Sequence, residues 1–454
     1  MRHSELRQEP ARGRWRRLPR RWELAALVLL LAGTARLNAQ TAGMPVGQTP
    51  GITLPSQAEG GDYLLGAAKL STSFSDNVLL SSENPQSDFI YAIQPSFTVA
   101  KTIGWMHMTW DFVPGYVKYQ RIAQRDRLTG AVVTDIDAKP TERWSVRVRN
   151  NYQVRRDPHF GDFAAEPVST YFQGTGGGTI LPLADQTVEE GNLDVAYQVG
   201  PATTLVGSFY FRDYSYQPVP GVEVSQYLVN SVSAIGRGQF FHQISPRLAL
   251  GAAYTYQDIS YSFSNHTAGV RASGAVGVGT FKITPAIQLQ FFGGPDFSQV
   301  QNQILVGLGG TSVFIPVNEN VTSGAGGVIL ALHKDRNSLQ IAVTRELSGG
   351  TGFTAAAVSN KADLTVRHEF SNRWYGEISS EYAVLTPLGS TGSGFDIHAL
   401  SIRAGLTHKF NQHFSIEIQA AHGTQDQTMN SVLRRVNVDF GMISLDYQIK
   451  HPIG

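Results

Sequence analysis

The stretch Gly104–Phe112 reads GWMHMTWDF and carries a large apolar side chain at every second position. Met106, Met108 and Trp110 fall on one side of an extended chain, and the residues between them fall on the other. A period of two is that of a β-strand with one apolar face and one polar face. The stretch therefore predicts a strand that separates an apolar medium from water.

The same alternation recurs along the chain, at 144–148, 339–344, 363–367 and 414–419. From residue 62 onward no apolar run approaches the ~20 residues that a transmembrane helix needs. Charged residues make up 16% of the chain, against ~25% in soluble domains, and the mean hydropathy is −0.14. Strands with one apolar and one polar face explain both values, because half of each strand is polar.

Two kinds of connection alternate between these segments, and this distinguishes a membrane barrel from a soluble β-sandwich. An aromatic residue often follows the short connections, as with Trp105, Trp144 and Trp374, in the manner of an aromatic girdle. Long, glycine-rich connections are expected at 156–186, 296–320 and 386–394. Short connections are expected at 101–104, 139–142, 199–203, 243–247, 283–286, 333–337, 369–373 and 409–413.

These turns set the number of strands. Eight short turns join sixteen strands, and one strand at each end raises the number to about 18. The weakest strand is 130–139, where Asp135 and Asp137 disturb the pattern, and its loss with a partner would leave 16. We predict a single all-β domain over 62–454, a transmembrane antiparallel up-and-down β-barrel with short periplasmic turns and long extracellular loops.

The first 39 residues have the layout of a secretory signal peptide. Arginines between Arg12 and Arg21 precede an apolar run, Leu24–Ala32, and small residues follow. Residues 40–61 are expected to form a flexible periplasmic leader. Met1–Ala39 holds nine Arg and three Glu, so its removal would lower the formal net charge from +1 to about −5.

The opening strands resemble those of a family of outer-membrane β-barrel porins, some of which are associated with exopolysaccharide systems. The resemblance lies in FSDNV at 74–78, DFI at 88–90, PSF at 95–97 and PGY at 114–116. It is strongest over about 62–127, and the remainder agrees in architecture only. The resemblance implies an outer-membrane barrel with a transport role and leaves the solute open. Tyr447 is followed by seven further residues, whereas barrels of this kind commonly end on an aromatic residue.

Charged residues on the polar face are the candidates for setting selectivity in the lumen, because Arg or Lys on the lipid face costs ~2–4 kcal/mol at midplane. They could instead form salt-bridge ladders that stabilise the wall. Their mixed sign predicts weak overall ion selectivity. Tyr210, Tyr375 and Tyr382 are candidates for an aromatic path for sugars. The charged set is Asp111, Arg147, Arg149, Arg212, Arg367, Glu377, Glu381, Arg403 and Glu417.

The sequence favours no catalytic, cofactor or metal site. The glycine runs at 174–178 and 307–310 lack the strand, helix and Lys-Ser/Thr of a phosphate-binding loop. The 12 histidines form no metal-ligand motif, and the chain has no cysteine. Its near-neutral charge argues against nucleic-acid binding. We therefore expect a protein that is not an enzyme and needs no cofactor.

The expected function is a bacterial outer-membrane channel for passive passage of small hydrophilic solutes or a polysaccharide. Its partners would be outer-membrane lipid, the barrel-assembly machinery and the solute or exopolysaccharide itself, with the oligomeric state left open. One alternative is a structural or adhesive barrel with a closed lumen, and a weaker one is an outer-membrane hydrolase.

Overall fold

The computed structural model describes residues 61–122, 125–155, 185–217, 229–262, 267–308, 311–348, 357–388, 396–429 and 432–453. The expected signal peptide, and the expected leader up to residue 60, lie outside this part of the chain. No helix among the described residues is long and apolar enough to cross a bilayer.

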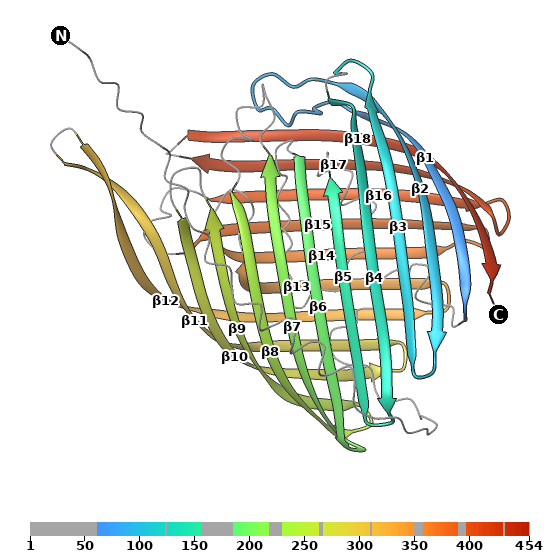
Figure 1. The fold of residues 1–454 in the computed structure, drawn as a ribbon, viewed down its shortest axis with the longest axis horizontal. Helices are drawn as coiled ribbons and strands as arrows, with labels where there is room; N and C mark the ends of the chain where they lie inside the picture. The colour runs from blue at the N-terminus through green and yellow to red at the C-terminus, as the bar shows by residue number, and fades with distance from the viewer. Residues whose placement is uncertain are drawn as a thin grey trace, which may run out of the picture. The chain divides into compact units, whose positions relative to one another are not determined.

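Eighteen antiparallel strands form one sheet, in which each strand pairs with the next along the chain and β18 pairs with β1 (Figure 1). The sheet is therefore closed, and the predicted all-β up-and-down barrel of 18 strands is confirmed. The strands are β1 Tyr63–Ser75, β2 Asp88–Ile103, β3 Met106–Tyr119, β4 Arg127–Thr141, β5 Trp144–Arg155, β6 Asp185–Gly200, β7 Thr203–Gln217, β8 Asn230–Ser245, β9 Leu248–Ser262, β10 Thr267–Thr284, β11 Ile287–Leu308, β12 Thr311–Lys334, β13 Asn337–Ser348, β14 Ala357–Glu369, β15 Trp374–Pro387, β16 Ile397–Lys409, β17 Phe414–Met429 and β18 Val432–Pro452.

The short turns lie at one end of the barrel and coincide with the eight that the sequence predicts. Their local chemistry is repetitive, because a Ser, Thr or Asn at the end of a strand accepts hydrogen bonds from backbone N–H groups of the turn. Ser245 Oγ accepts from the N–H groups of Arg247 at 3.3 Å and Leu248 at 3.1 Å, and Ser371 Oγ does the same for its own turn. These side chains satisfy donors that the ladder leaves free and so fix the register of the hairpins.

Backbone hydrogen bonds also join successive turns around this rim. The N–H of Gln243 donates to the carbonyl of Ala202 at 2.7 Å, and equivalent bonds of 2.7–3.0 Å link the other turns. Where the chain enters β1, the carboxylate of Asp62 lies 2.6 Å from Lys101 Nζ. The hydrogen bond from Lys101 holds the pKa of Asp62 below its usual value.

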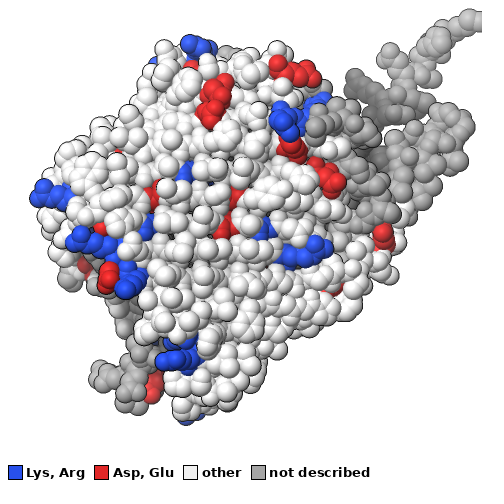
Figure 2. All heavy atoms as spheres, turned by 180° about the vertical axis from the view of Figure 1, so that it is seen from behind, with Lys and Arg blue, Asp and Glu red and all other residues white. Residues whose placement is uncertain are grey.

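The outer face of the sheet is apolar from the short-turn end to the middle of the strands, as a barrel in lipid requires, whereas charged outer-face residues such as Asp258 and Arg435 lie nearer the other end. Trp105, Trp144 and Trp374, which follow short turns, are each about 41–42% exposed, and Ile341, Ile378 and Ile418 extend the same face toward the middle of the strands. On the side of the barrel shown in Figure 2, uncharged atoms make up most of the surface. A closed sheet leaves no unpaired edge, so this surface can face hydrocarbon without exposing backbone polar groups.

The prediction of a long connection at 296–320 is wrong, because most of this segment belongs to β11 and β12. These strands pair with each other as far as Leu308 and Thr311. Among the described residues, β11 pairs with β10 only as far as Gln301, and β12 pairs with β13 only from Gly326 onward. The rest of the hairpin pairs only with itself and extends past the adjacent strands in Figure 1. A two-stranded ribbon of this kind extends beyond the wall of the barrel.

Strands β8–β12 form a glycine-rich sector in which backbones approach closely. A Cβ added to Gly251 would lie 2.0 Å from the carbonyl oxygen of Phe240, and one added to Gly294 would lie 2.0 Å from that of Ala275. Next to Gly294, Pro295 has no N–H to donate to the ladder, and pairing between β10 and β11 is interrupted there. Only residues without a side chain fit such a close approach.

Candidate functional site: the polar interior

All nine charged residues predicted for the lumen lie on the inner face of the barrel. The pairing fixes this, because side chains directly opposite each other on adjacent strands share a face, and the register can be followed around the closed sheet. Asp111, Arg147, Arg149 and Arg212 lie on β3–β7. The other five, Arg367, Glu377, Glu381, Arg403 and Glu417, lie on β14–β17.

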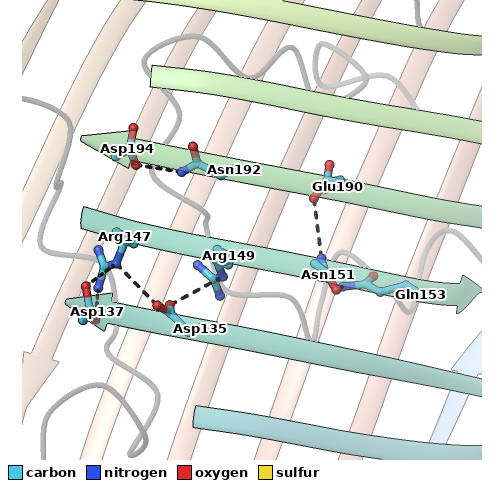
Figure 3. Close-up of polar contacts among 9 residues, drawn as sticks. All are labelled: Asp135, Asp137, Arg147, Arg149, Asn151, Gln153, Glu190, Asn192 and Asp194. Carbon is cyan, nitrogen blue, oxygen red and sulfur yellow. Dashed lines mark hydrogen bonds and ion pairs between the residues drawn. The ribbon is translucent and has the colours of Figure 1, made fainter. Parts of the chain in front are cut away.

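The first group centres on two arginines of β5 (Figure 3). Arg147 Nε lies 3.0 Å from Asp137 and 3.5 Å from Asp135, both on β4. Arg149 Nε lies 4.0 Å from Asp135. The two carboxylates that make 130–139 a weak strand in the sequence are therefore inner-face residues paired with the arginines opposite them.

Hydrogen bonds extend this network to β6 and β7. Glu190 lies 3.0 Å from Arg212 Nε, accepts a hydrogen bond from the Tyr214 hydroxyl at 3.1 Å, and is joined to Asn151 at 3.5 Å. Asp194 accepts from Asn192 at 2.8 Å and from the Ser208 hydroxyl. Neighbouring side chains of the wall are thus locked together across three strands.

The second group lies on β14–β18 and reaches β1. Lys361 Nζ lies 3.3 Å from Asp363 and 3.0 Å from Glu381. Lys69 of β1 lies 3.3 Å from Glu417, across the junction that closes the barrel. A third basic side chain, Arg367, lies 3.6 Å from Glu369 and places its guanidinium 4.3 Å from the ring centre of Tyr375.

Eleven further charged residues of the inner face away from its rims were not predicted from the sequence. For some of them, such as Asp137 opposite Arg147 and Asp446 opposite Lys69, the signal is an opposite charge on the facing strand, which requires the register to be known. Of the three tyrosines expected on the inner face, Tyr210 and Tyr375 lie there, whereas Tyr382 lies on the outer face, 45% exposed. The missed charged residues are Lys69, Asp135, Asp137, Glu190, Asp194, Arg237, Asp296, Glu346, Lys361, Asp363 and Asp446.

Inside the glycine-rich sector the wall is packed with apolar side chains. Phe241, Val276, Val278 and Phe292 form a buried cluster on β8–β11. Beside it lies a pocket of about 40 Å³ that is lined by residues from β8 through β13, including Ile235 and Glu346. The sheet thus curls enough in this sector for side chains of β8 and β13 to meet around one small pocket.

Glu346 connects the two charged groups. It lies on β13, yet it interacts electrostatically with Arg212 and Arg237 on β7 and β8 as well as with Lys361 on β14. Only the curvature of β9–β12 brings these strands together. Glu346 therefore lies between the two charged groups, on the β13 side of the packed sector. In the part of the chain that the structure describes, no group of three or more His, Asp or Glu side chains is placed to hold a metal ion.

No protein-family model and no curated protein matches the chain. Among solved structures it is similar to OpdK of Pseudomonas aeruginosa, crystallised with vanillate, at 9% identity, covering 86% of this chain and 99% of that one with a TM-score of 0.42. OccAB3 of Acinetobacter baumannii is similar at 9% identity, covering 86% of this chain and 99% of that one with a TM-score of 0.42. The ferric-catecholate import receptor Fiu of E. coli K12 is similar at 8% identity, covering 86% of this chain and 82% of that one with a TM-score of 0.45.

The class of protein follows from the chain's own geometry. Its sheet is closed, its outer face is apolar and its inner face carries charged and hydrogen-bonding side chains. Closed barrels of this kind are the only β-structures that span a bilayer. The barrel that the family resemblance implies is confirmed, and its link to exopolysaccharide stays a prediction. The chain has the architecture of a bacterial outer-membrane β-barrel with a porin-like interior.

Proposed function

We propose that the protein is a passive outer-membrane channel for small hydrophilic solutes or a polysaccharide. The charged and hydrogen-bonding lining of the inner face carries this proposal, since a barrel that only anchored a surface structure would not need so many ionisable groups inside. Eighteen strands enclose more space than their own side chains fill, whereas about eight do not. A lining of this kind replaces part of the hydration shell of a passing solute.

Ion pairs along the wall have two roles in such a channel. They hold charged side chains against the wall, so that the path between them stays open to water. They also present alternating donors and acceptors to the solute, as Arg147, Asp135 and Arg149 do on neighbouring strands. The nine residues predicted from the sequence would then contribute to selectivity and to the strength of the wall together.

Conductance of the refolded protein in planar bilayers tests the proposal. We expect discrete conductance steps when protein that migrates as a folded, heat-modifiable band is added. Heat-denatured protein in the same detergent is the control and should give none. Folded, inserted protein without any conductance would contradict the channel and favour the closed, adhesive barrel.

Liposome swelling with sugars of increasing size distinguishes a channel for small solutes from a channel for a polysaccharide. Liposome swelling should be fast with monosaccharides and should fall steeply with chain length if the path admits only small solutes. Swelling that persists with long oligosaccharides would support the polysaccharide instead.

A further inference from the structure

We propose that the channel prefers cations over anions, in contrast to the weak ion selectivity that the mixed sign of the nine sequence-predicted residues alone would give. This inference rests on the proposed channel function and concerns the charges that line its path. Among described inner-face residues away from the two rims, twelve are acidic and eight are basic. The acidic ones are Asp111, Asp135, Asp137, Glu190, Asp194, Asp296, Glu346, Asp363, Glu377, Glu381, Glu417 and Asp446; the basic ones are Lys69, Arg147, Arg149, Arg212, Arg237, Lys361, Arg367 and Arg403.

Ion pairing decides how strongly this excess of acidic over basic side chains acts on a passing ion. Six of the basic side chains lie within 4.0 Å of a carboxylate, which is on the same or an adjacent strand for five of them and on β17 for Lys69 of β1. Each of these pairs presents a dipole to the lumen rather than a full charge. Arg237 and Arg403 also have interaction partners. The positive charge of the interior is therefore largely matched at short range.

Several carboxylates are held by neutral groups instead. Asp111 accepts a hydrogen bond from the Thr98 hydroxyl, and Asp194 accepts from Asn192, Ser208 and Tyr210. Asp446 accepts from the Ser444 hydroxyl at 3.3 Å. Neither these three nor Glu377 lies within ion-pair distance of a Lys or Arg in the described chain, although Arg149 and Arg367 act on Asp111 and Glu377 at longer range.

These carboxylates lie on separate parts of the wall. Asp194 is directly opposite Arg147 in the pairing of β5 with β6, next to the network of Figure 3, whereas Glu377 lies on β15. Negative charge thus faces the path from two parts of the barrel. Such charges act through their field on every passing ion and need not coordinate one.

Two further observations make the excess effective. Packing of Phe241, Val276 and Phe292 fills the sector that is poorest in charge, so an ion passes along the charged strands. Basic side chains at the short-turn mouth, Lys282, Lys409 and Lys450, are exposed to bulk solvent. Salt screens exposed charges over ~10 Å at 0.1 M, so we expect them to weigh less than the half-buried interior carboxylates.

Reversal potentials in a KCl gradient across planar bilayers test the inference. We expect a several-fold higher permeability for K⁺ than for Cl⁻ in the unaltered protein. The triple variant Asp111→Asn, Asp194→Asn, Glu377→Gln should bring the ratio close to one or below it. A control with a similar change in charge outside the lumen, Asp258→Asn, Asp426→Asn, Asp439→Asn, alters outer-face residues and should leave the ratio unchanged.

The outcomes separate this inference from the proposed function. Absence of conductance from folded protein would overturn the channel itself. Conductance without cation preference, or a preference that survives the triple interior variant, would overturn only the inference. Folding of each variant is checked first by heat-modifiable migration, and single substitutions replace the triple variant if it does not fold.

Discussion

The charged strands and the glycine-rich strands form one closed sheet but hold their interiors together in different ways. On β3–β7 and β13–β18, inner side chains meet as ion pairs and hydrogen bonds. On β8–β12, inner charges are reduced to Arg237 and Asp296 away from the rims, and the side chains pack as an apolar cluster. The difference shows that one closed sheet can have a charged interior along some strands and an apolar, packed interior along others.

The largest effect is expected from crowding the glycine-rich strands. In Gly294→Val, the new side chain would begin with a Cβ 2.0 Å from the carbonyl oxygen of Ala275, and a backbone oxygen cannot move aside without breaking the ladder. We expect loss of the heat-modifiable folded band. Gly238→Val is the matched control, since a Cβ there meets nothing within 4 Å and faces outward. Equal folding of both variants would mean that close backbone approach does not shape this sector.

A smaller effect is expected from breaking the charged strands. Arg147→Gln leaves Asp135 and Asp137 facing each other with Arg149 alone nearby, and an uncompensated, half-buried carboxylate costs about 1–3 kcal/mol. Urea unfolding in detergent micelles, followed by tryptophan fluorescence, measures the loss of unfolding free energy.

The second substitution Asp137→Asn should restore part of that stability, because it removes the repulsion. Arg435→Gln is the control: it breaks an exposed ion pair with Asp426 at 2.6 Å on the outer face, worth about 0–1 kcal/mol. A loss for Arg147→Gln no greater than for Arg435→Gln would show that the interior network contributes nothing beyond a surface pair.

Of these two regions, only the charged strands could be predicted from the sequence. Period-two alternation identifies the inner face of single strands, so all nine charged residues fall where expected. Asp135 and Asp137 weaken the pattern of β4 because their explanation, Arg147 and Arg149, lies on the next strand. The sequence predicts a loop where the extended β11–β12 ribbon lies because the segment is rich in glycine, which is typical of connections.

The packed sector could not be predicted from local patterns. Its curvature arises from glycines whose neighbours are on other strands, as with Gly251 against Phe240 and Gly294 against Ala275. The approach of Glu346 to Arg212 joins strands far apart in the chain and depends on that curvature. Such contacts follow from the closed shape of the whole sheet, which a single sequence does not specify residue by residue.

The smallest effect is expected from removing an uncharged side chain, Asn151, that forms hydrogen bonds among the charged residues of the inner face. Asn151 accepts a hydrogen bond from Gln153 at 2.9 Å and donates one to Glu190 at 3.5 Å. Asn151→Ala removes both, but water in the lumen can solvate the groups left behind, so the loss of unfolding free energy should stay near the low end of the ~0.5–1.5 kcal/mol typical of a hydrogen bond. Because Glu190 keeps Arg212 and Tyr214, the conductance should hardly change. An Asn151→Ala loss as large as that of Arg147→Gln would mean that the wall is held by its hydrogen bonds as strongly as by its charges, and that water does not reach this part of the interior.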